Sequence, residues 1–499
     1  MGTRTPVASL CAGIYPIANA MRVRHPTEGY LAQVKKDTSE GSSKPMALYH
    51  TNKTEDHVKN RSRVLFIATA AIVALALLSS ACAPAAAPTP TAAKPAAPAA
   101  TPAKPAAPAT PAAPVATPAK PAATPAASAP SAAGGWGTIT IPKGSPIKIG
   151  LGAMLTGDYA KLGNDIKNGA LFAVEGKGTI DGFKLELRAE DDGCEGAPSV
   201  SVAEKMIADP LVAGFVGNMC SGGSIPASEV YNRAKIVMIS ASSTADGFTA
   251  KKLPIVNRTT WNDVVQGKAA AEFALKKLNA KTAAVLHDKS SYGQGLADEF
   301  KKNFEAGGGK TVAYEGLTRG DKDFTAVLTK IKPSNPEVVY FGGMAAEGAL
   351  LARQIKDVGI QGKFVSDEGL YDEKDYIQAS GGAAEGTYVT YAKTPEGSKF
   401  ADWKKKYEAK YGPIGTYTAQ AYDAASVLMA AIEKVAKTGA DGSLQIDKKA
   451  LADAVRASNV EGVTGLIKFD DRGDRVGATV VVWQVKNGKF VEVPGGTGS

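Results

Sequence analysis

Short apolar runs alternate with amphipathic stretches along the C-terminal two-thirds of the chain. The apolar runs predict buried strands at residues 146–153, 184–189, 212–216 and 236–239, and, after Gly267, at residues 282–287, 310–314, 337–341 and 363–365. Apolar positions at helical spacing predict helices between them, at residues 161–175, 293–304, 324–331 and 347–358. Alternation of this kind is typical of parallel sheets covered by helices on both faces. Because it runs through two consecutive sets, the sequence predicts an α/β fold with two doubly wound, Rossmann-like lobes.

Polar loops follow several of these strands, and ligands in such sheets bind beyond the carboxyl ends of the strands. Residues 218–224 and 240–244 offer hydroxyls and backbone N–H groups that suit an anion. Residues 366–369 offer carboxylates to a cation, and residues 287–293 supply an aromatic ring. Ordinary capping or turn chemistry would explain any one of these loops by itself.

The segment at residues 59–81 has the layout of an export signal. Fifteen uncharged residues, Val64–Leu78, follow three basic residues and precede small residues and Cys82. This resembles the lipobox of bacterial lipoproteins, whose cysteine is lipidated, although Ser79 replaces the usual aliphatic residue. An uncleaved membrane anchor is the alternative, since Val64–Ala83 is just long enough to span. Both interpretations export the following domain and hold it at a membrane.

The regions beside this signal are unlike a folded domain. Residues 1–58 form a leader that we expect to be untranslated in part, with Met46 the best-placed start. After Cys82, residues 83–133 hold 14 of the 29 prolines, which blocks helix and sheet. We therefore predict an extended stalk over residues 82–133, reaching at most roughly 160 Å, in front of a domain over residues 134–499.

The charge of the chain is concentrated in its front part. The net charge is +9, but residues 1–133 hold 13 of the 58 basic and 5 of the 49 acidic residues. The domain that follows is almost neutral and has no electrostatic footprint for nucleic acid. The basic character therefore indicates export, not a nucleic-acid partner.

The four cysteines divide by position. Cys11 lies in the leader and Cys82 is the lipidation candidate, which leaves Cys194 and Cys220 in the exported domain. An oxidising compartment favours a disulfide between these two, with two free buried thiols as the alternative. A metal site is disfavoured because no histidine is near.

Nothing in the domain has the pattern of a catalytic or cofactor site. Among the four histidines only His287 lies there, and no Ser-His-Asp order or HExxH motif is present. We therefore predict a protein that is not an enzyme and that uses no metal or cofactor.

Six segments of the domain carry a family resemblance. In chain order they read VGNMCSGGSIPASEVY, IVMISASSTA, IVNRTTWNDVVQGKAAA, AAVLHDKSSYGQGLA, EVVYFGG and FVSDEGL. Together they resemble the leucine/isoleucine/valine-binding protein family, the type I periplasmic binding proteins that deliver amino acids to ABC importers. The resemblance covers about residues 146–490.

The resemblance implies two lobes joined by three crossovers, with the ligand in the cleft between them. Lobe one would comprise about residues 146–262 and 392–480, and lobe two about residues 263–391 and 481–495. The implied protein is a monomeric, lipid-anchored substrate-binding protein that hands an amino acid, of branched-chain type by preference, to permease subunits. A sensor component, or the same fold binding amides, urea or another small metabolite, is the alternative.

The resemblance also implies roles for individual residues. Ser221 and Thr244 match hydroxyl donors to the ligand carboxylate, while the Ser242 carbonyl and Glu368 match partners of its ammonium group. The positions that match the remaining features are Tyr292 and Tyr417 (aromatics at the ligand), Leu162 and Met344 (pocket wall, where the leucine-binding archetype has tyrosines), and Cys194 with Cys220 (disulfide).

Overall fold

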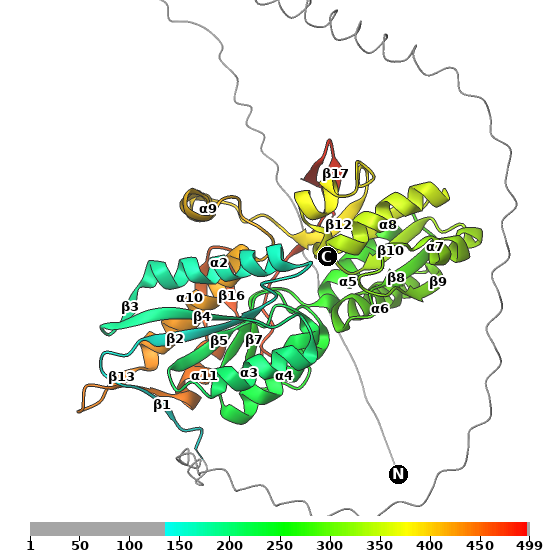
Figure 1. Ribbon diagram of the computed structural model, residues 1–499. Helices are drawn as coiled ribbons and strands as arrows, with labels where there is room; N and C mark the ends of the chain where they lie inside the picture. The colour runs from blue at the N-terminus through cyan, green and yellow to red at the C-terminus, as the bar shows by residue number, and fades with distance from the viewer. Residues whose placement is uncertain (1–134, 497–499) are drawn as a thin grey trace, which may run out of the picture. The chain divides into compact units, whose positions relative to one another are not determined.

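The computed structural model describes residues 135–496 (Figure 1). The leader, the signal segment, Cys82 and the stalk lie outside these residues. Within residues 135–496, no helix combines the length and the apolar character needed to cross a membrane.

The first sheet contains the strands that come earliest in the described chain. Its strands, in spatial order, are β3 (Thr179–Ile180), β4 (Phe183–Asp191), β2 (Ile147–Ala153), β5 (Val212–Val216), β6 (Met238–Ser240) and β7 (Val256–Arg258). All neighbours run parallel except β3 and β4. Every residue of β5 is buried, as expected for a central strand covered on both faces. This sheet is the centre of lobe one.

Helices from two distant parts of the chain cover this sheet. They are α2 (Ala160–Lys177), α3 (Gly196–Ile207), α4 (Ser221–Ala234), α10 (Thr418–Val435) and α11 (Lys448–Arg456). Helix α9 (Ser398–Tyr411) packs on α2 and α10 through an aromatic cluster. Helix α10 packs against α2, β5 and β6, so the orange C-terminal helices in Figure 1 lie beside cyan and green elements. Two small sheets add to lobe one, namely β1 (Thr138–Ile141) with β14 (Leu444–Asp447) and β13 (Lys437–Thr438), and β15 (Asn459–Gly462) with β16 (Gly465–Lys468).

The second sheet forms lobe two. Its order is β18 (Lys489–Glu492), β17 (Val480–Lys486), β12 (Tyr388–Ala392), β11 (Lys363–Ser366), β10 (Val338–Gly342), β8 (Thr282–His287) and β9 (Lys310–Gly316). Strands β8 to β12 are parallel, whereas β17 and β18 form an antiparallel edge. The main helices of this lobe are α5 (Asp263–Lys276), α6 (Ser291–Ala306), α7 (Thr325–Ile331) and α8 (Ala345–Val358).

The chain passes between the two lobes three times. The passages follow β7, follow β12 and precede β17, at residues 259–262, 393–397 and about 470–479. The fold is therefore α/β with two doubly wound lobes, as the apolar pattern predicts, and the lobes are joined by three crossovers, as the family resemblance implies. The predicted strands and helices agree with the structure to within about two residues, but the alternation did not reveal the antiparallel edge of β17 and β18.

Strand register brings the loops of each lobe to one edge. In lobe two, Gly342 pairs with His287 and Phe341 with Ser366, so β8, β10 and β11 end level with one another. In lobe one, Val216 pairs with both Leu151 and Ile239. The loops that follow these strands therefore gather at the carboxyl edges of the two sheets.

Candidate ligand-binding site

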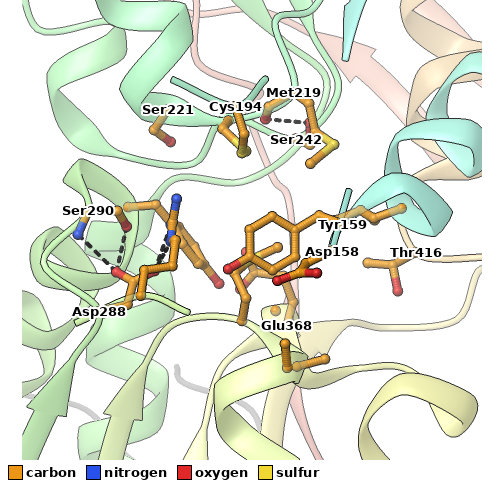
Figure 2. A pocket seen from close by; sticks show the side chains of 18 of the residues that line it. Asp158, Tyr159, Cys194, Met219, Ser221, Ser242, Asp288, Ser290, Glu368 and Thr416 are labelled. Atoms are coloured by element: carbon orange, nitrogen blue, oxygen red, sulfur yellow. Dashed lines mark hydrogen bonds and ion pairs between the residues drawn. A yellow bond between two sulfur atoms is a disulfide. The ribbon is translucent and has the colours of Figure 1, made fainter. Parts of the chain in front are cut away.

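A cavity of about 610 Å³ is lined by loops from the carboxyl edges of both sheets (Figure 2). Figure 2 shows Ser221 and Ser242 on one side of the pocket and Glu368 on the other. Of the residues singled out from the sequence, those that line the cavity are Leu162, Cys194, Cys220, Ser221, Ser242, Tyr292, Met344, Glu368 and Tyr417. Its volume is in the range of small-molecule sites in proteins.

Ser221 stands at the first position of helix α4, directly after the loop that follows β5. Cys220 is the N-cap residue of this helix and has an extended backbone. The first N–H groups of a helix lack partners within it and carry the positive end of its dipole. Ser221 and Gly222 line the cavity, and their N–H groups together with the Ser221 hydroxyl are chemically suited to binding an anion.

Hydrogen bonds hold the loop after β6 against this helix start. The Ser221 hydroxyl accepts from the N–H of Ala245 at 3.2 Å, and the Ser242 hydroxyl donates to the Met219 carbonyl at 2.8 Å. Thr244 is fully buried and is not among the cavity-lining residues. Its carbonyl accepts from the N–H of Asp263 at 2.9 Å, so it connects the loop to the start of helix α5.

A disulfide joins Cys194 and Cys220 immediately behind Ser221. It links the loop after β4 to the N-cap position of helix α4. The disulfide that an oxidising compartment favours and that the family resemblance implies is therefore present. It fixes the start of helix α4, whose first residues line the cavity.

Loss of this bridge should destabilise the domain. The bridge spans 26 positions, so the chain-entropy estimate of its contribution is about 3 kcal/mol. We expect the double substitution Cys194→Ser and Cys220→Ser to lower the free energy of unfolding by that amount in urea denaturation. The reduced wild type should match the double variant, and equal midpoints for the oxidised wild type and the variant would contradict the expectation.

Glu368 is one of the acids that lobe two contributes to the cavity. It opens the 3₁₀ turn Glu368–Leu370 after β11 and is only 3% exposed. Its carboxylate accepts from the Tyr417 hydroxyl at 2.7 Å and from the Gln266 amide at 2.5 Å. Gln266 in turn bonds to Thr390 at 2.9 Å. The carboxylate is thus fixed in position at the floor of the cavity.

Two further acids are buried close to Glu368. Burial raises the pKa of Glu368, and the hydrogen bonds from Tyr417 and Gln266 oppose that rise. The pKa values of Asp263 and Asp367 are also raised, first by burial and then by the charge of Glu368. A cationic group beside Glu368 would favour the charged form of its carboxylate.

Two tyrosines from different lobes lie next to Glu368. Tyr292 is in the first turn of helix α6, and Tyr417 is the N-cap residue of helix α10 with a φ of +64°. The Tyr417 ring stacks on Trp261, with centroids 5.7 Å apart. Tyr159 and Tyr371 also line the cavity. Aromatic rings therefore line the cavity although Leu162 and Met344 are not aromatic.

The sequence prediction missed several lining residues. Asp158 and Tyr159 lie in the loop after β2. Arg319 and Lys322 follow β9. The rule that ligands bind beyond strand ends would have found both loops, but only the tertiary structure selects which of their side chains reach the cavity.

A family model described as a periplasmic binding protein matches residues 146–489. A leucine-, isoleucine-, valine-, threonine- and alanine-binding protein of Pseudomonas aeruginosa is 36% identical over 336 residues, which is 66% of this chain and 87% of the relative. A Leu/Ile/Val-binding protein of Escherichia coli is 31% identical over 338 residues, covering 66% of this chain and 88% of the relative.

Solved structures show the same fold. The leucine-binding protein LivK of Thermotoga maritima superposes with a TM-score of 0.64 at 29% identity, covering 70% of this chain and 97% of its own. A Rhodopseudomonas palustris solute-binding protein in complex with benzoate gives a TM-score of 0.64 at 23% identity, covering 71% and 97%, and shows the fold alone. Proteins of this kind bind solutes and are not enzymes. The chain belongs to the periplasmic binding protein family, within its group of leucine/isoleucine/valine-binding proteins.

Proposed function

We propose that this protein is the extracytoplasmic substrate-binding lipoprotein of an ABC importer. It binds an amino acid, preferably of branched-chain type, in the cavity between its lobes and delivers it to the permease subunits. The observation that carries the proposal is the pairing, in one cavity, of a hydroxyl-lined helix start with a buried acid from the other lobe. An α-amino acid has the two opposite charges that this pairing requires.

The residues proposed to hold the charged groups of the ligand, Ser221, Ser242 and Glu368, are called the clamp, and each has one role. Ser221 holds the α-carboxylate with the N–H groups around it, and the Ser242 carbonyl accepts from the ligand ammonium. The family resemblance implies that Thr244 shares the carboxylate, but Thr244 is fully buried outside the cavity and supports the loop instead. Glu368 pairs with the same ammonium from lobe two. The rings of Tyr292 and Tyr417 cover the ligand, and the wall facing its side chain includes Leu162 and Met344.

The mechanism follows from the division of the clamp between the lobes. The carboxylate partners belong to lobe one and Glu368 belongs to lobe two, so the zwitterion contacts both lobes only when the cleft is closed. A ligand that binds the closed state more tightly shifts the population toward it. The permease then recognises the closed, ligand-bound conformation.

The proposed location rests on the sequence in front of the domain. Lipid on Cys82 anchors a monomer to the outer face of the cytoplasmic membrane, and the stalk over residues 83–133 gives the domain reach. These residues lie outside the described part of the chain. Mass spectrometry of the N-terminal peptide from membranes tests this proposal, since an unmodified peptide that includes Val64–Leu78 would favour an uncleaved anchor.

A ligand screen tests the binding function. We expect leucine, isoleucine or valine to raise the melting temperature of the purified protein, with urea, short amides and benzoate as comparison ligands. A shift with the comparison ligands alone would overturn the amino-acid assignment and leave the binding-protein assignment in place.

Ser221 provides the first test of the carboxylate clamp. Ser221→Ala removes a hydroxyl donor to a charged group, an interaction that contributes about 1.5–3 kcal/mol, so leucine affinity should fall about tenfold or more in titration calorimetry. Ser201→Ala, at an exposed position on helix α3, is the matched control and should bind as the wild type does. Equal affinity of the two variants would refute the role of Ser221.

A further inference from the structure

Arg319 contributes a fixed guanidinium group to one wall of the cavity. It lies in the loop between β9 and α7, and its side chain is 23% exposed. Its Nε and Nη2 atoms donate to Oδ2 of Asp288 at 3.2 and 2.6 Å, and Asp288 is 3% exposed. The guanidinium carbon lies 5.5 Å from the centroid of the Tyr159 ring. Partners on two sides therefore hold the group in one place.

The remaining nitrogen of this guanidinium faces a carboxylate of the other lobe. Nη1 of Arg319 is 3.7 Å from Oε1 of Glu195, beyond hydrogen-bonding distance. Glu195 also lines the cavity, and its side chain is 67% exposed. A donor and an acceptor thus stand side by side across the cleft, close enough for one small group to bond to both.

The opposite charges of Arg319 and Glu195 favour an uncharged group that has both an acceptor and a donor between them. Asp288 already compensates Arg319, so a second carboxylate would gain the guanidinium but meet the charges of Asp288 and Glu195. An ammonium group would be attracted to these acids and repelled by Arg319. A carboxamide avoids both conflicts, because its carbonyl accepts from Arg319 while its NH₂ group donates to Glu195.

The cavity has room for a ligand that reaches this wall. Even if each of the nine non-hydrogen atoms of leucine took the roughly 30 Å³ that a whole water molecule occupies in the liquid, leucine would fill at most about 270 Å³. The cavity measures about 610 Å³. Space therefore remains beyond a branched-chain side chain for a longer polar tail or for water.

From this geometry we infer that Arg319 and Glu195 form a specificity-determining pair, which extends the ligand range to α-amino acids with a carboxamide tail, such as glutamine. The inference rests on the proposed function, because the α-carboxylate and ammonium of glutamine occupy the same clamp as those of leucine.

Titration calorimetry on the wild type with four amino acids is the first test. Glutamine should bind at least tenfold more tightly than glutamate, with leucine as the reference ligand and methionine as an apolar ligand of similar length. Binding of leucine without measurable binding of glutamine would overturn this inference alone. Absence of binding by all four amino acids would overturn the proposed function as well.

Two variants assign the effect to the pair. Arg319→Met should weaken glutamine binding at least tenfold and change leucine and methionine binding less than threefold. Glu195→Ala should act in the same direction while Asp288 keeps its partner, so it remains informative if the Arg319 variant folds poorly. Arg353→Met, at an exposed position of helix α8, is the control. An equal loss for leucine and glutamine, or unchanged glutamine binding in both variants, would refute the role of the pair.

Discussion

Replacing Glu368 by glutamine should weaken leucine binding at least tenfold in titration calorimetry. The substitution keeps the size of the side chain and removes the charge that, in the proposed complex, faces the ligand ammonium. A hydrogen bond to a charged group contributes about 1.5–3 kcal/mol, and each 1.4 kcal/mol is a factor of ten in affinity. Glu373→Gln is the matched control, because it makes the same change at an exposed position five residues further along. Unchanged affinity in the Glu368 variant would refute the assignment of the ammonium partner.

The same residue gives the binding a pH dependence with a defined sign. Burial raises the pKa of Glu368 above its ordinary value, so protonation begins at a higher pH than for an exposed glutamate. The neutral carboxyl group attracts an ammonium less, and leucine affinity should therefore fall as the pH decreases through that raised pKa. The Glu368→Gln variant should lack this part of the dependence. An identical pH profile for both proteins would show that another group titrates.

Arg258→Met should lower the free energy of unfolding by about 3–5 kcal/mol, the usual cost of leaving one member of a buried ion pair alone. The Arg258 side chain is completely buried and pairs with Asp474 at 2.7 Å. Burial lowers the pKa of this guanidinium, and the charge of Asp474 opposes the shift. Removal of the arginine leaves Asp474 without its strongest partner, and urea denaturation followed by circular dichroism measures the loss.

The same substitution should also weaken ligand binding. Arg258 donates to the carbonyls of Ser243 and Ala245 at 2.7 and 3.1 Å, and these residues belong to the loop that carries Ser242 and Thr244. Arg233→Met is the control, since Arg233 forms an exposed pair with Glu204 that should contribute about 1 kcal/mol or less. Similar destabilisation by both variants would contradict the special role of the buried arginine.

Much of the secondary structure follows from local patterning. The strands at Val212–Val216 and Thr282–His287 have the bounds expected from their apolar runs, because a central parallel strand is buried on both faces and leaves a continuous apolar signal. The antiparallel edge of lobe two is different. Strand β17 pairs with β12 although about ninety residues separate them, and no local pattern records such a partner.

The site also contains residues that the sequence indicated and residues that only the structure revealed. Glu368 and Ser221 could be singled out because each follows a strand end and carries a matching family motif. Arg319 could not, since its place at the cavity depends on Asp288 in a different loop and on Tyr159 in the other lobe. Tyr159 is a second example. It stands only three positions before Leu162, but packing sets the direction of its loop, so the sequence did not indicate that its ring lines the cavity.

The sequence by itself determined the α/β class, the two-lobed order of elements, the family and the loops that hold the candidate clamp. These features follow from the spacing of apolar residues and from short motifs, both of which are local properties of the sequence. The tertiary structure decided how the strand ends align, which side chains of each loop enter the cavity, and that Arg319 and Glu195 face one another across it. These features depend on contacts between distant segments, whose geometry is fixed only when the two lobes are packed and joined by their three crossovers.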